Sequence, residues 1–360
     1  MHYGDSISKE LGGYSLVKYR EFGNTGLKVS VLGFGGASLG SRSNRKKSIK
    51  ALNEAFAQGI NLYDTAPFYG QGESERIIGN VFKKRRDKVI ITTKIGLYPS
   101  AKLQFLSKFK PIVRSFFQML PGNEKRLMQK SVQSFMMANN RIEFEPSTIV
   151  KSVESSLKRL QCDYIDILLL HVLPHPSDFD GVIEKLKLLR QQGKIRYFGA
   201  CPHSLEEAIS LLRMSENDFS TLQIRLNMLE VEAIDSCLPI SSGKGLAIIA
   251  REPFAQGKLL KPKLNNASEL EFVGHKYDSR FDFLAKDNVR TLPQAALQFL
   301  IQTERIAAIL TGMSSVSHMR ENLAALDLPE LTSEEIKMIR TVTTTRGSIQ
   351  NNLNTRSIQG

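Results

Sequence analysis

Short apolar runs recur along the whole chain. Eight of them are rich in β-branched and aromatic residues and are continuous rather than alternating: SVLGFG (30–35), INLYD (60–64), VIITTK (89–94), IDILLLH (165–171), IRYFGA (195–200), TLQIRLN (221–227), GLAIIAR (245–251) and IAAILTG (306–312). Continuous runs of this length are typical of parallel strands that are buried on both faces. We therefore predict one parallel sheet.

Amphipathic helix patterns lie between most of these runs. In residues 146–160, PSTIVKSVESSLKRL, one helical face collects Val150, Val153, Leu157 and Leu160. Two Ser/Thr-x-x-Glu spacings predict capping boxes at helix starts: Ser204 with Glu207, and Thr332 with Glu335. Gly59 and Gly193 stand where a helix would end before the next strand. The pattern is therefore one of strands that alternate with helices.

Eight strands that are each followed by a helix match the count of an α/β (β/α)8 TIM barrel, and a doubly wound sheet is the alternative. The peptide REFGNTGLKVS precedes the first core strand and predicts a hairpin around Asn24-Thr25-Gly26, which we expect to close the bottom of the barrel. We predict one domain over residues 18–340, with flexible tails at 1–17 and 341–360.

Two connections are too long for a simple crossover: Ile95 to Pro146 and Glu252 to Leu292. Both follow the carboxyl end of a strand, where barrel enzymes keep their active sites, so we expect both to cover a site. The first includes an insert at 97–146 after the third strand. It mixes apolar side chains with cations, a composition that suits a lid over a bulky, amphipathic or anionic substrate.

The formal net charge of +13 raises the question of a polyanionic partner. The chain has no zinc-finger spacing, no basic region with heptads and no aromatic RNA-binding motif, so we expect a solvated basic surface and no nucleic acid. A nucleic-acid or membrane patch on the basic insert is the weaker alternative. No apolar stretch is long enough to span a membrane, and the first residues lack the pattern of a signal peptide. Three cysteines without ligand-like spacing predict no metal site and a cytoplasmic location.

Polar and reactive residues stand at the ends of the predicted strands: Asp64, Lys94, His171, Cys201, Gln223, Arg251 and Gly312. Each has an ordinary structural explanation when taken alone, such as a turn for Asp64 or a core histidine for His171. In a barrel these strand ends converge on one face, and Tyr69 follows Asp64 closely in NLYDTAPFYG. The sequence GFGGAS (33–38) does not complete a dinucleotide fingerprint, because Ser38 replaces its last glycine.

Several stretches carry a family resemblance: FGNTGLKVSVLGFGGASLG, GINLYDTAPFYGQGESERIIG, VIITTKIG, LKRLQCDYIDILLLH, GKIRYFGA and GMSSVSHMRENLAA. From Tyr19 to Arg340 the chain resembles the aldo-keto reductase superfamily, and the last stretch is similar to L-galactose dehydrogenase-like members. This resemblance implies a (β/α)8 barrel that binds a nicotinamide cofactor without a Rossmann domain. It also implies a catalytic tetrad, which falls here on Asp64, Tyr69, Lys94 and His171.

The resemblance implies a role for each member of the tetrad. Tyr69 would exchange a proton with the substrate oxygen, and Lys94 would stabilise its phenolate and lower its pKa. Asp64 would hold Lys94, and His171 would orient the substrate. The expected reaction interconverts an alcohol and a carbonyl group of an aldehyde, ketone or sugar. A non-catalytic, cofactor-binding regulatory subunit on the same barrel is the alternative.

The resemblance also implies cofactor contacts, at Gly36, Ala37, Cys201, Gln223, Arg251, Pro253, Phe254, Gln256, Gly257, Gly312, Ser314, Ser315, His318 and Asn322. Cys201 and Pro202 replace the usual Ser-Asn pair, and Arg251 stands where many members stack an aromatic ring. His318 and Gly312 stand where NADP-specific members carry cations, which favours NAD slightly over NADP. We expect a small-molecule substrate and a monomer or homo-oligomer.

Overall fold

The computed structural model describes residues 17–40, 44–99, 140–214, 219–260, 277–313 and 315–356. They fall into two compact units. One comprises residues 35–52 and 63–202, and the other comprises the chain up to residue 34, residues 53–62 and the chain from residue 203 onward.

Eight strands form the central sheet: β3 (Leu32–Gly35), β4 (Leu62–Asp64), β5 (Ile90–Ile95), β8 (Ile165–Leu170), β9 (Ile195–Ala200), β10 (Thr221–Arg225), β11 (Ala247–Arg251) and β12 (Ile306–Gly312). Their order is β10-β11-β12-β3-β4-β5-β8-β9, and the sheet closes on itself as a parallel barrel. Each lies within or beside an apolar run that predicted it. A closed sheet confirms the (β/α)8 fold and excludes the doubly wound alternative.

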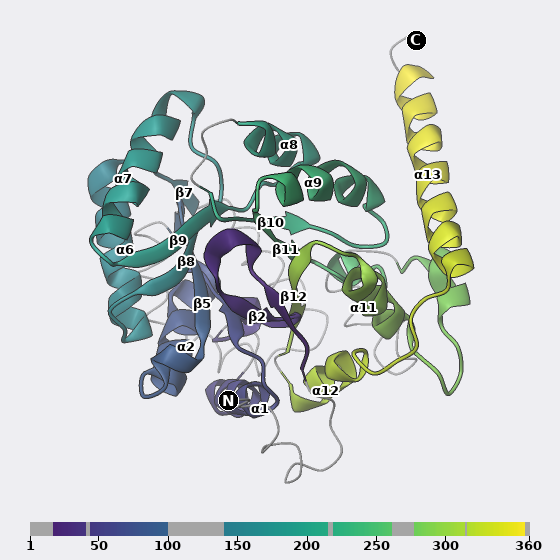
Figure 1. Ribbon diagram of the computed structural model, residues 1–360, viewed down its shortest axis with the longest axis horizontal. Coiled ribbons are helices and arrows are strands. Elements are labelled where there is room, and N and C mark those ends of the chain that lie inside the picture. Colours follow the sequence, from purple (N-terminus) through teal and green to yellow (C-terminus); the bar gives the residue numbers. More distant parts are fainter. Residues whose placement is uncertain are drawn as a thin grey trace, which may run out of the picture. The chain divides into compact units, whose positions relative to one another are not determined.

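In the unit of residues 35–52 and 63–202, strands β5, β8 and β9 pair in register, with Lys94 opposite Leu169 and Leu170 opposite Ala200. Helices α2 (Glu73–Phe82), α6 (Pro146–Leu160) and α7 (Phe179–Gln191) lie outside these strands (Figure 1). Helix α2 packs closely on the end of α6, because a Cβ atom on Gly79 would lie 2.4 Å from the carbonyl oxygen of Leu160. Gly193 ends α7 in the left-handed conformation that its position predicts.

Helix α6 buries a face slightly different from the predicted one. Its buried residues are Ile149, Val153, Ser156 and Leu160. Val150 and Leu157, which we expected in the core, are only partly buried. Helix α6 packs against α2 and α7 as well as against β5, so the sheet alone does not set its buried face.

In the other unit, β1 (Tyr19–Glu21) and β2 (Lys28–Ser30) form the predicted antiparallel hairpin, joined by η1 (Gly23–Thr25). The backbone N–H of Asn24 donates to the carbonyl oxygen of Gly245 (2.9 Å), just before β11. The guanidinium of Arg20 donates to the carbonyl oxygen of Ile306, the first residue of β12, at 2.6 Å. The hairpin therefore packs against the amino ends of β11 and β12.

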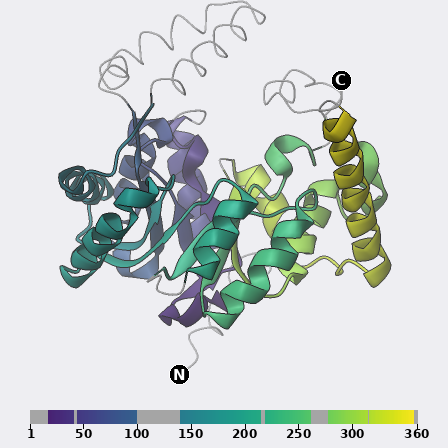
Figure 2. The ribbon, with the colours of Figure 1, turned by 90° about the horizontal axis from the view of Figure 1, so that it is seen from above.

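The same unit carries α8 (Leu205–Arg213), α9 (Val231–Gly243), α11 (Leu292–Gln302), α12 (Val316–Ala324) and α13 (Ser333–Arg356), whereas α1 (Arg45–Ala57) is shared between the two units. Figure 2 shows α13 as a long helix beside η7 (Ser279–Leu284). Thr332 and Glu335 form the full capping box that their spacing predicts. Ser204 caps α8, but the carboxylate of Glu207 accepts from the N–H of His203 instead of Ser204.

Helix α13 crosses the predicted end of the domain at residue 340. Its residues 341–356 are helical, so this part of the predicted tail continues an element of the fold. Thr343 donates to the carbonyl oxygen of Met228 (2.8 Å), and Arg340 pairs with Asp235 of α9 (2.6 Å). These contacts hold α13 against its own unit.

The insert at 97–146 opens and closes on a small antiparallel pair, β6 (Leu97–Pro99) and β7 (Asn140–Ile142). Gly96 precedes it with a positive φ of 94°, and the ring of Phe144 fills the space where a Cβ would stand. Residues 100–139, which the lid prediction concerns, lie outside the described residues, as do residues 261–276 of the second long connection.

Candidate functional site

The carboxyl edge of β4, β5, β8 and β9 brings three predicted catalytic residues together. Asp64 ends β4, Lys94 is the penultimate residue of β5, and His171 directly follows β8. The N–H of His171 donates to the carbonyl oxygen of Ile95 (2.8 Å), and the N–H of Cys201 donates to that of Leu170 (2.8 Å). Each connection therefore leaves the barrel at the same edge, as strand-end positions of a parallel barrel require.

Lys94 and Asp64 form a buried ion pair. The ammonium donates to both carboxylate oxygens of Asp64 (2.6 and 2.8 Å) and to the carbonyl oxygen of Thr65 (3.0 Å). Lys94 is 1% exposed and Asp64 4%. Burial is the largest single effect and lowers the pKa of Lys94, but the charge of Asp64, its hydrogen bond and the charges of Tyr69 and Cys201 together outweigh it, so the pKa of Lys94 is raised. The lysine is therefore a fixed positive charge.

Tyr69 lies beside this charge, in the short helix η3 (Tyr69–Gln71). The Lys94 ammonium is 5.1 Å from the centre of the Tyr69 ring. The rings of Tyr69 and His171 meet edge to face, with 6.1 Å between their centres and 86° between their planes. All four predicted tetrad residues thus gather in one unit of the chain.

The pKa of the Tyr69 phenol is raised above its ordinary value of 10.0. Burial is the largest cause, the charge of Lys94 lowers the pKa in part, and the charge of Asp64 raises it. The sequence led us to expect a lowered pKa. Lys94 acts in the expected direction, but the cost of burying a phenolate exceeds its effect, a balance that only the packed structure determines.

Two side chains at the start of α2, without a predicted role, reach the strands that carry the ion pair. Ser74 accepts a hydrogen bond from the hydroxyl of Thr65 (2.8 Å) and donates to the carbonyl oxygen of Gly36 (2.9 Å). A Cβ on Gly36 would lie 2.5 Å from the carbonyl oxygen of Asp64, which gives this predicted cofactor residue a structural reason to be glycine. Glu75 accepts from the hydroxyl of Thr93 (2.7 Å).

Residues 252–260, directly after β11, include several predicted cofactor residues, and three non-glycine residues among them have a positive φ: Glu252 (58°), Ala255 (48°) and Gln256 (57°). Such conformations cost energy and are concentrated at functional sites. Glu252 holds the loop, since its carboxylate accepts from Arg251 (2.5 Å) and Gln256 (2.8 Å) and pairs with Arg225 (3.3 Å). Sequence reasoning assigned no role to Glu252 or Arg225.

The remaining cofactor candidates of this unit lie in β10 and at the end of β12. Gln223 is buried in β10. Ser315 caps α12 by accepting from the N–H of His318 (3.2 Å), and His318 is exposed on the first turn. Asn322 donates to the carbonyl oxygen of Gly312 (3.4 Å) and so ties α12 to β12. Ser314 lies outside the described residues.

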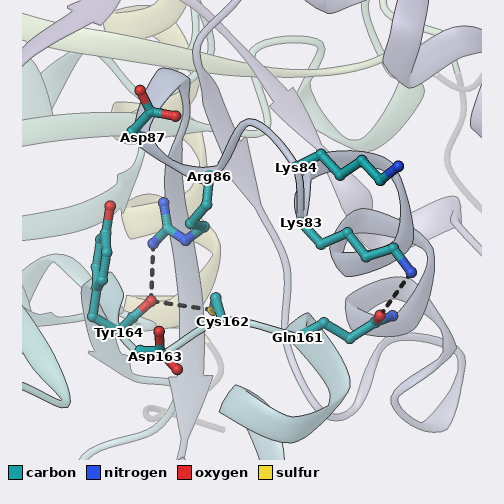
Figure 3. Close-up of a pocket in the computed structure, with 8 residues that line it drawn as sticks. All are labelled: Lys83, Lys84, Arg86, Asp87, Gln161, Cys162, Asp163 and Tyr164. Atoms are coloured by element: carbon teal, nitrogen blue, oxygen red, sulfur yellow. Dashed lines mark hydrogen bonds between the residues drawn. The ribbon is translucent and has the colours of Figure 1, made fainter.

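A polar pocket of about 310 Å³ lies at the opposite, amino ends of β5 and β8 (Figure 3). Its lining is Lys83, Lys84, Arg86, Asp87, Gln161, Cys162, Asp163 and Tyr164. None of these is a predicted site residue. Within the lining, Lys83 is hydrogen-bonded to Gln161 (3.2 Å) and Arg86 to the carbonyl oxygen of Tyr164 (3.0 Å). These hydrogen bonds connect the segment before β5 with the segment before β8.

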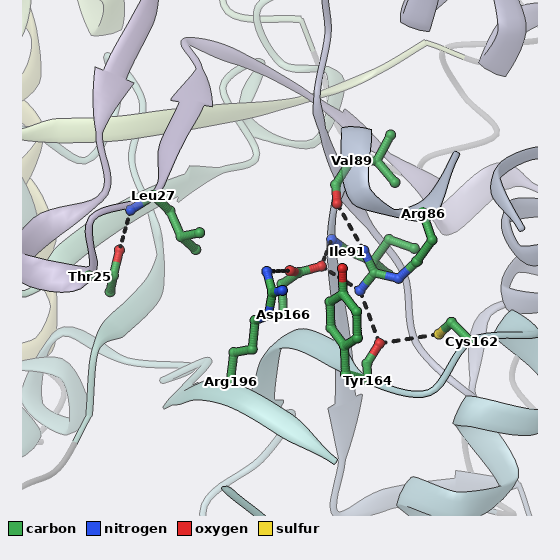
Figure 4. Close-up of polar contacts among 9 residues, drawn as sticks. All are labelled: Thr25, Leu27, Arg86, Val89, Ile91, Cys162, Tyr164, Asp166 and Arg196. Carbon is green, nitrogen blue, oxygen red and sulfur yellow. Dashed lines mark hydrogen bonds and ion pairs between the residues drawn. The ribbon is translucent and has the colours of Figure 1, made fainter. Parts of the chain in front are cut away.

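Beside this pocket, buried Asp166 joins three segments (Figure 4). Its carboxylate pairs with Arg86 (2.5 Å) and Arg196 (3.1 Å) and accepts from the N–H of Ile91 (2.9 Å). Both guanidinium groups also face the ring of Tyr164, at 4.2 and 4.0 Å. Asp166 therefore fastens β8 to the starts of β5 and β9, at the end of the strands away from Lys94.

The part of the chain that the structure describes contains no cluster of three or more His, Cys, Asp or Glu residues that could hold a metal ion. Among the same residues, no helix combines the length and the apolar character needed to cross a membrane.

Comparison with known proteins gives consistent matches. The sequence profile of the Aldo/keto reductase family matches residues 31–343. The chain is 29% identical to the L-galactose dehydrogenase of Arabidopsis thaliana over 86% of its length and 88% of the relative's. It is 26% identical to the NADH-specific methylglyoxal reductase of Escherichia coli, over 85% of this chain and 92% of that relative. The aldo-keto reductase AKR11C1 of Bacillus halodurans, in its holo form, superimposes with a TM-score of 0.68 and 26% identity, over 90% of this chain and 96% of that one.

Proposed function

Because this chain belongs to the aldo-keto reductase family of oxidoreductases, we propose that it is an NAD(P)-dependent enzyme that interconverts a carbonyl group and an alcohol. The observation that carries the proposal is the buried Lys94–Asp64 pair beside Tyr69. A buried ion pair next to a largely buried phenol suits proton transfer, because both groups are fixed where a substrate oxygen can approach.

When bound, the reduced nicotinamide supplies a hydride to the carbonyl carbon of the substrate. Tyr69 donates the proton of its hydroxyl to the carbonyl oxygen during reduction, and takes a proton from the alcohol during oxidation. Lys94 stabilises the phenolate that forms after the proton has left. Asp64 keeps Lys94 charged and in place, and His171 orients the substrate oxygen towards Tyr69.

The raised pKa of Tyr69 keeps the phenol protonated through the neutral range, so it holds the proton that carbonyl reduction needs. The same rise makes the phenol a weaker acid, so donation depends on stabilisation of the phenolate. The charge of Lys94 remains necessary, because without it nothing would offset the free energy that desolvation of the buried phenolate costs.

Residues at and beside the predicted cofactor positions have a chemistry that fits an anionic dinucleotide. Arg225, Arg251 and Lys258 place cations at and near the strained loop after β11, and α12 offers its amino end with Ser315 and His318. Helix amino ends and cationic side chains are the usual partners of phosphate groups. Gln223, buried in β10, would contact the carboxamide of the nicotinamide.

Turnover tests the proposal against the alternative of a non-catalytic, cofactor-binding subunit. A panel of aldehydes, ketones and sugars is assayed with both cofactors, by the absorbance of the reduced nicotinamide. We expect at least one substrate to be turned over, and Tyr69→Phe to lower kcat about a hundredfold or more with little change in cofactor affinity. Tyr164→Phe, which removes a hydroxyl at the amino end of β8, is the matched control and should keep full activity. Near-normal turnover by Tyr69→Phe would remove Tyr69 from its role.

A further inference from the structure

The first turn of α2 carries two adjacent side chains that reach the strands bearing the ion pair. Ser74 is hydrogen-bonded to the hydroxyl of Thr65 (2.8 Å), and Thr65 directly follows Asp64. Glu75 is hydrogen-bonded to the hydroxyl of Thr93 (2.7 Å), and Thr93 directly precedes Lys94. One helix turn thus contacts the neighbours of both partners in the ion pair.

These contacts are shielded from solvent. Thr65, Ser74, Glu75 and Thr93 are each 0% exposed. A hydrogen bond in such a place is strong, and losing one partner leaves the other without water to replace it. The positions of the two strands are therefore coupled tightly to that of α2.

The side chains of a strand alternate between its faces, so Thr93 and Lys94 project to opposite sides of β5. Thr93 points towards the helix that carries Glu75. Thr65 contributes in a second way, since its carbonyl oxygen accepts from the Lys94 ammonium (3.0 Å) while its hydroxyl donates to Ser74. The hydrogen bonds from α2 therefore reach β5 on its helix-facing side, and the Lys94 ammonium projects from the opposite face.

Both anchors are themselves fixed. Ser74 donates to the carbonyl oxygen of Gly36, where no larger residue fits. Glu75 pairs with Arg159 of α6 (2.5 Å), and Gly79 lets α2 approach that helix. A buried carboxylate with two partners, on a helix packed against a second helix, has little freedom to move.

We propose that Ser74 and Glu75 are positioning residues for the Asp64–Lys94 pair. They set where β4 and β5 end relative to each other and so keep the Lys94 ammonium beside Tyr69. This inference rests on the proposed function, because it assigns the two residues a part in the same proton transfer. It also gives a reason for the Ser-Glu dipeptide within DTAPFYGQGESERIIG, to which sequence analysis assigned no role.

Two variants test the proposal, and each removes a single hydroxyl: Ser74→Ala and Thr93→Val. Because small displacements of a catalytic group are costly, we expect each to lower kcat about tenfold, with the dissociation constant of the reduced cofactor changed by less than about twofold. In a Lys94→Met background, adding Ser74→Ala should cause no further loss of kcat. Ser241→Ala is the matched control, because Ser241 is equally buried and its hydroxyl donates only to Leu238 of its own helix (3.0 Å).

A second measurement needs no turnover. In protein labelled with ¹⁵N-lysine, a buried ammonium held by three acceptors exchanges its protons slowly and gives a signal, which its loss in Lys94→Met assigns to Lys94. We expect this signal in the unmodified chain and in Ser241→Ala, and its broadening or loss in Ser74→Ala and Thr93→Val. This result would stand even if no substrate were found, which separates the inference from the proposed function.

The opposite outcomes would overturn the proposal. If both variants keep the Lys94 signal and normal kcat, and only their melting temperatures fall, the two side chains serve folding alone. A loss of kcat that adds fully to that of Lys94→Met would also contradict it, since it would mean that Ser74 acts independently of the lysine. Should Ser74→Ala not fold, Thr93→Val alone decides, because valine keeps the shape and β-branching of threonine.

Discussion

At the scale of single residues, the balance of forces on Tyr69 determines its chemistry. A free tyrosine already holds its proton at neutral pH, and burial strengthens that hold, whereas the charge of Lys94 works against it. The net pKa of Tyr69 lies above its ordinary value. The protonated form is therefore the resting form, and the phenolate is the minority species over the working range.

This balance predicts opposite pH dependences for the two directions. Reduction needs the phenol and should stay nearly constant between about pH 7 and pH 9, whereas oxidation needs the phenolate and should rise throughout the same range. The oxidation rate rises with pH because the pKa of Tyr69 lies above this range, and below its pKa the phenolate fraction increases with each rise in pH. Profiles of kcat/KM in both directions check this, and an oxidation rate that levels off below about pH 9 would contradict it.

Lys94→Met extends the same argument. Removing the ammonium raises the pKa of Tyr69 further, so oxidation at neutral pH should fall about a hundredfold or more and its rise should move to higher pH. Lys88→Met is a suitable control, because Lys88 is exposed at the amino end of β5 and pairs with its neighbour Asp87 (3.4 Å). Equal effects from the two variants would show that Lys94 does not act on Tyr69.

At the scale of elements, close helix packing and a buried carboxylate hold the sheet in place. Gly79 allows α2 to touch the backbone at the end of α6, and Asp166 connects β8 with the starts of β5 and β9. Neither residue contacts the Lys94–Asp64 pair, so each provides a test of stability that is separate from chemistry.

Glycine-to-alanine substitutions in two helices should change stability in opposite directions. In Gly79→Ala the new Cβ would lie 2.4 Å from the Leu160 carbonyl oxygen, a backbone atom that cannot move aside, so we expect a loss of about 2 kcal/mol or more. In Gly181→Ala the Cβ on α7 would meet nothing within 4 Å, and we expect a gain of about 0.5–1 kcal/mol from the stiffer unfolded chain. Urea denaturation of both variants measures the difference, and losses of equal size would refute the close contact.

Asp166→Asn should destabilise the fold without changing the reaction. Asparagine keeps the shape of the side chain but removes the charge that faces Arg86 and Arg196. Breaking a buried pair costs about 3–5 kcal/mol, and because the Arg196 side chain is 49% exposed we expect a loss of about 2–4 kcal/mol. Asp163→Asn, at an exposed position of the same loop, should change stability by about 0.5 kcal/mol or less. Similar losses in both variants would argue against the network.

At the scale of the whole molecule, cofactor binding and stability are linked. A ligand that binds only the folded chain raises its stability, by about 2.7 kcal/mol at a hundred times its dissociation constant. The choice between NAD and NADP can therefore be measured on the intact protein. The Escherichia coli relative is an NADH-specific methylglyoxal reductase.

We predict that NAD is used at least as well as NADP. His318 stands exposed on the first turn of α12, and Arg320, on the same helix, lies 3.7 Å from Glu54, so the charge near a 2′-phosphate is partly neutralised. NADH should raise the melting temperature at least as much as NADPH at equal concentration. Arg320→Ala should leave the NADH effect unchanged. A preference for NADP above about tenfold, or 1.4 kcal/mol, would reverse this conclusion.

The sequence by itself determined the fold and the candidate residues. Apolar runs located all eight strands because burial on both faces requires unbroken apolar sequence, and Asn24-Thr25-Gly26 located the hairpin because its turn needs a left-handed glycine, which Gly26 supplies with a φ of 73°. The positions of Asp64, Lys94 and His171 followed from strand ends, since a parallel barrel brings such ends to one face. These patterns are local in the sequence, so they can be recognised without knowing which residues pack against each element.

Only the tertiary structure decided the features that depend on distant neighbours. Helix α6 buries Ile149 rather than Val150, because it packs against α2 and α7 as well as against β5. The hydrogen bond between Glu75 and Thr93 joins two different elements, and no repeating pattern in the sequence predicts such a pair. The pKa of Tyr69 is raised rather than lowered, because desolvation depends on every atom packed around the phenol and the sequence names only its charged neighbours.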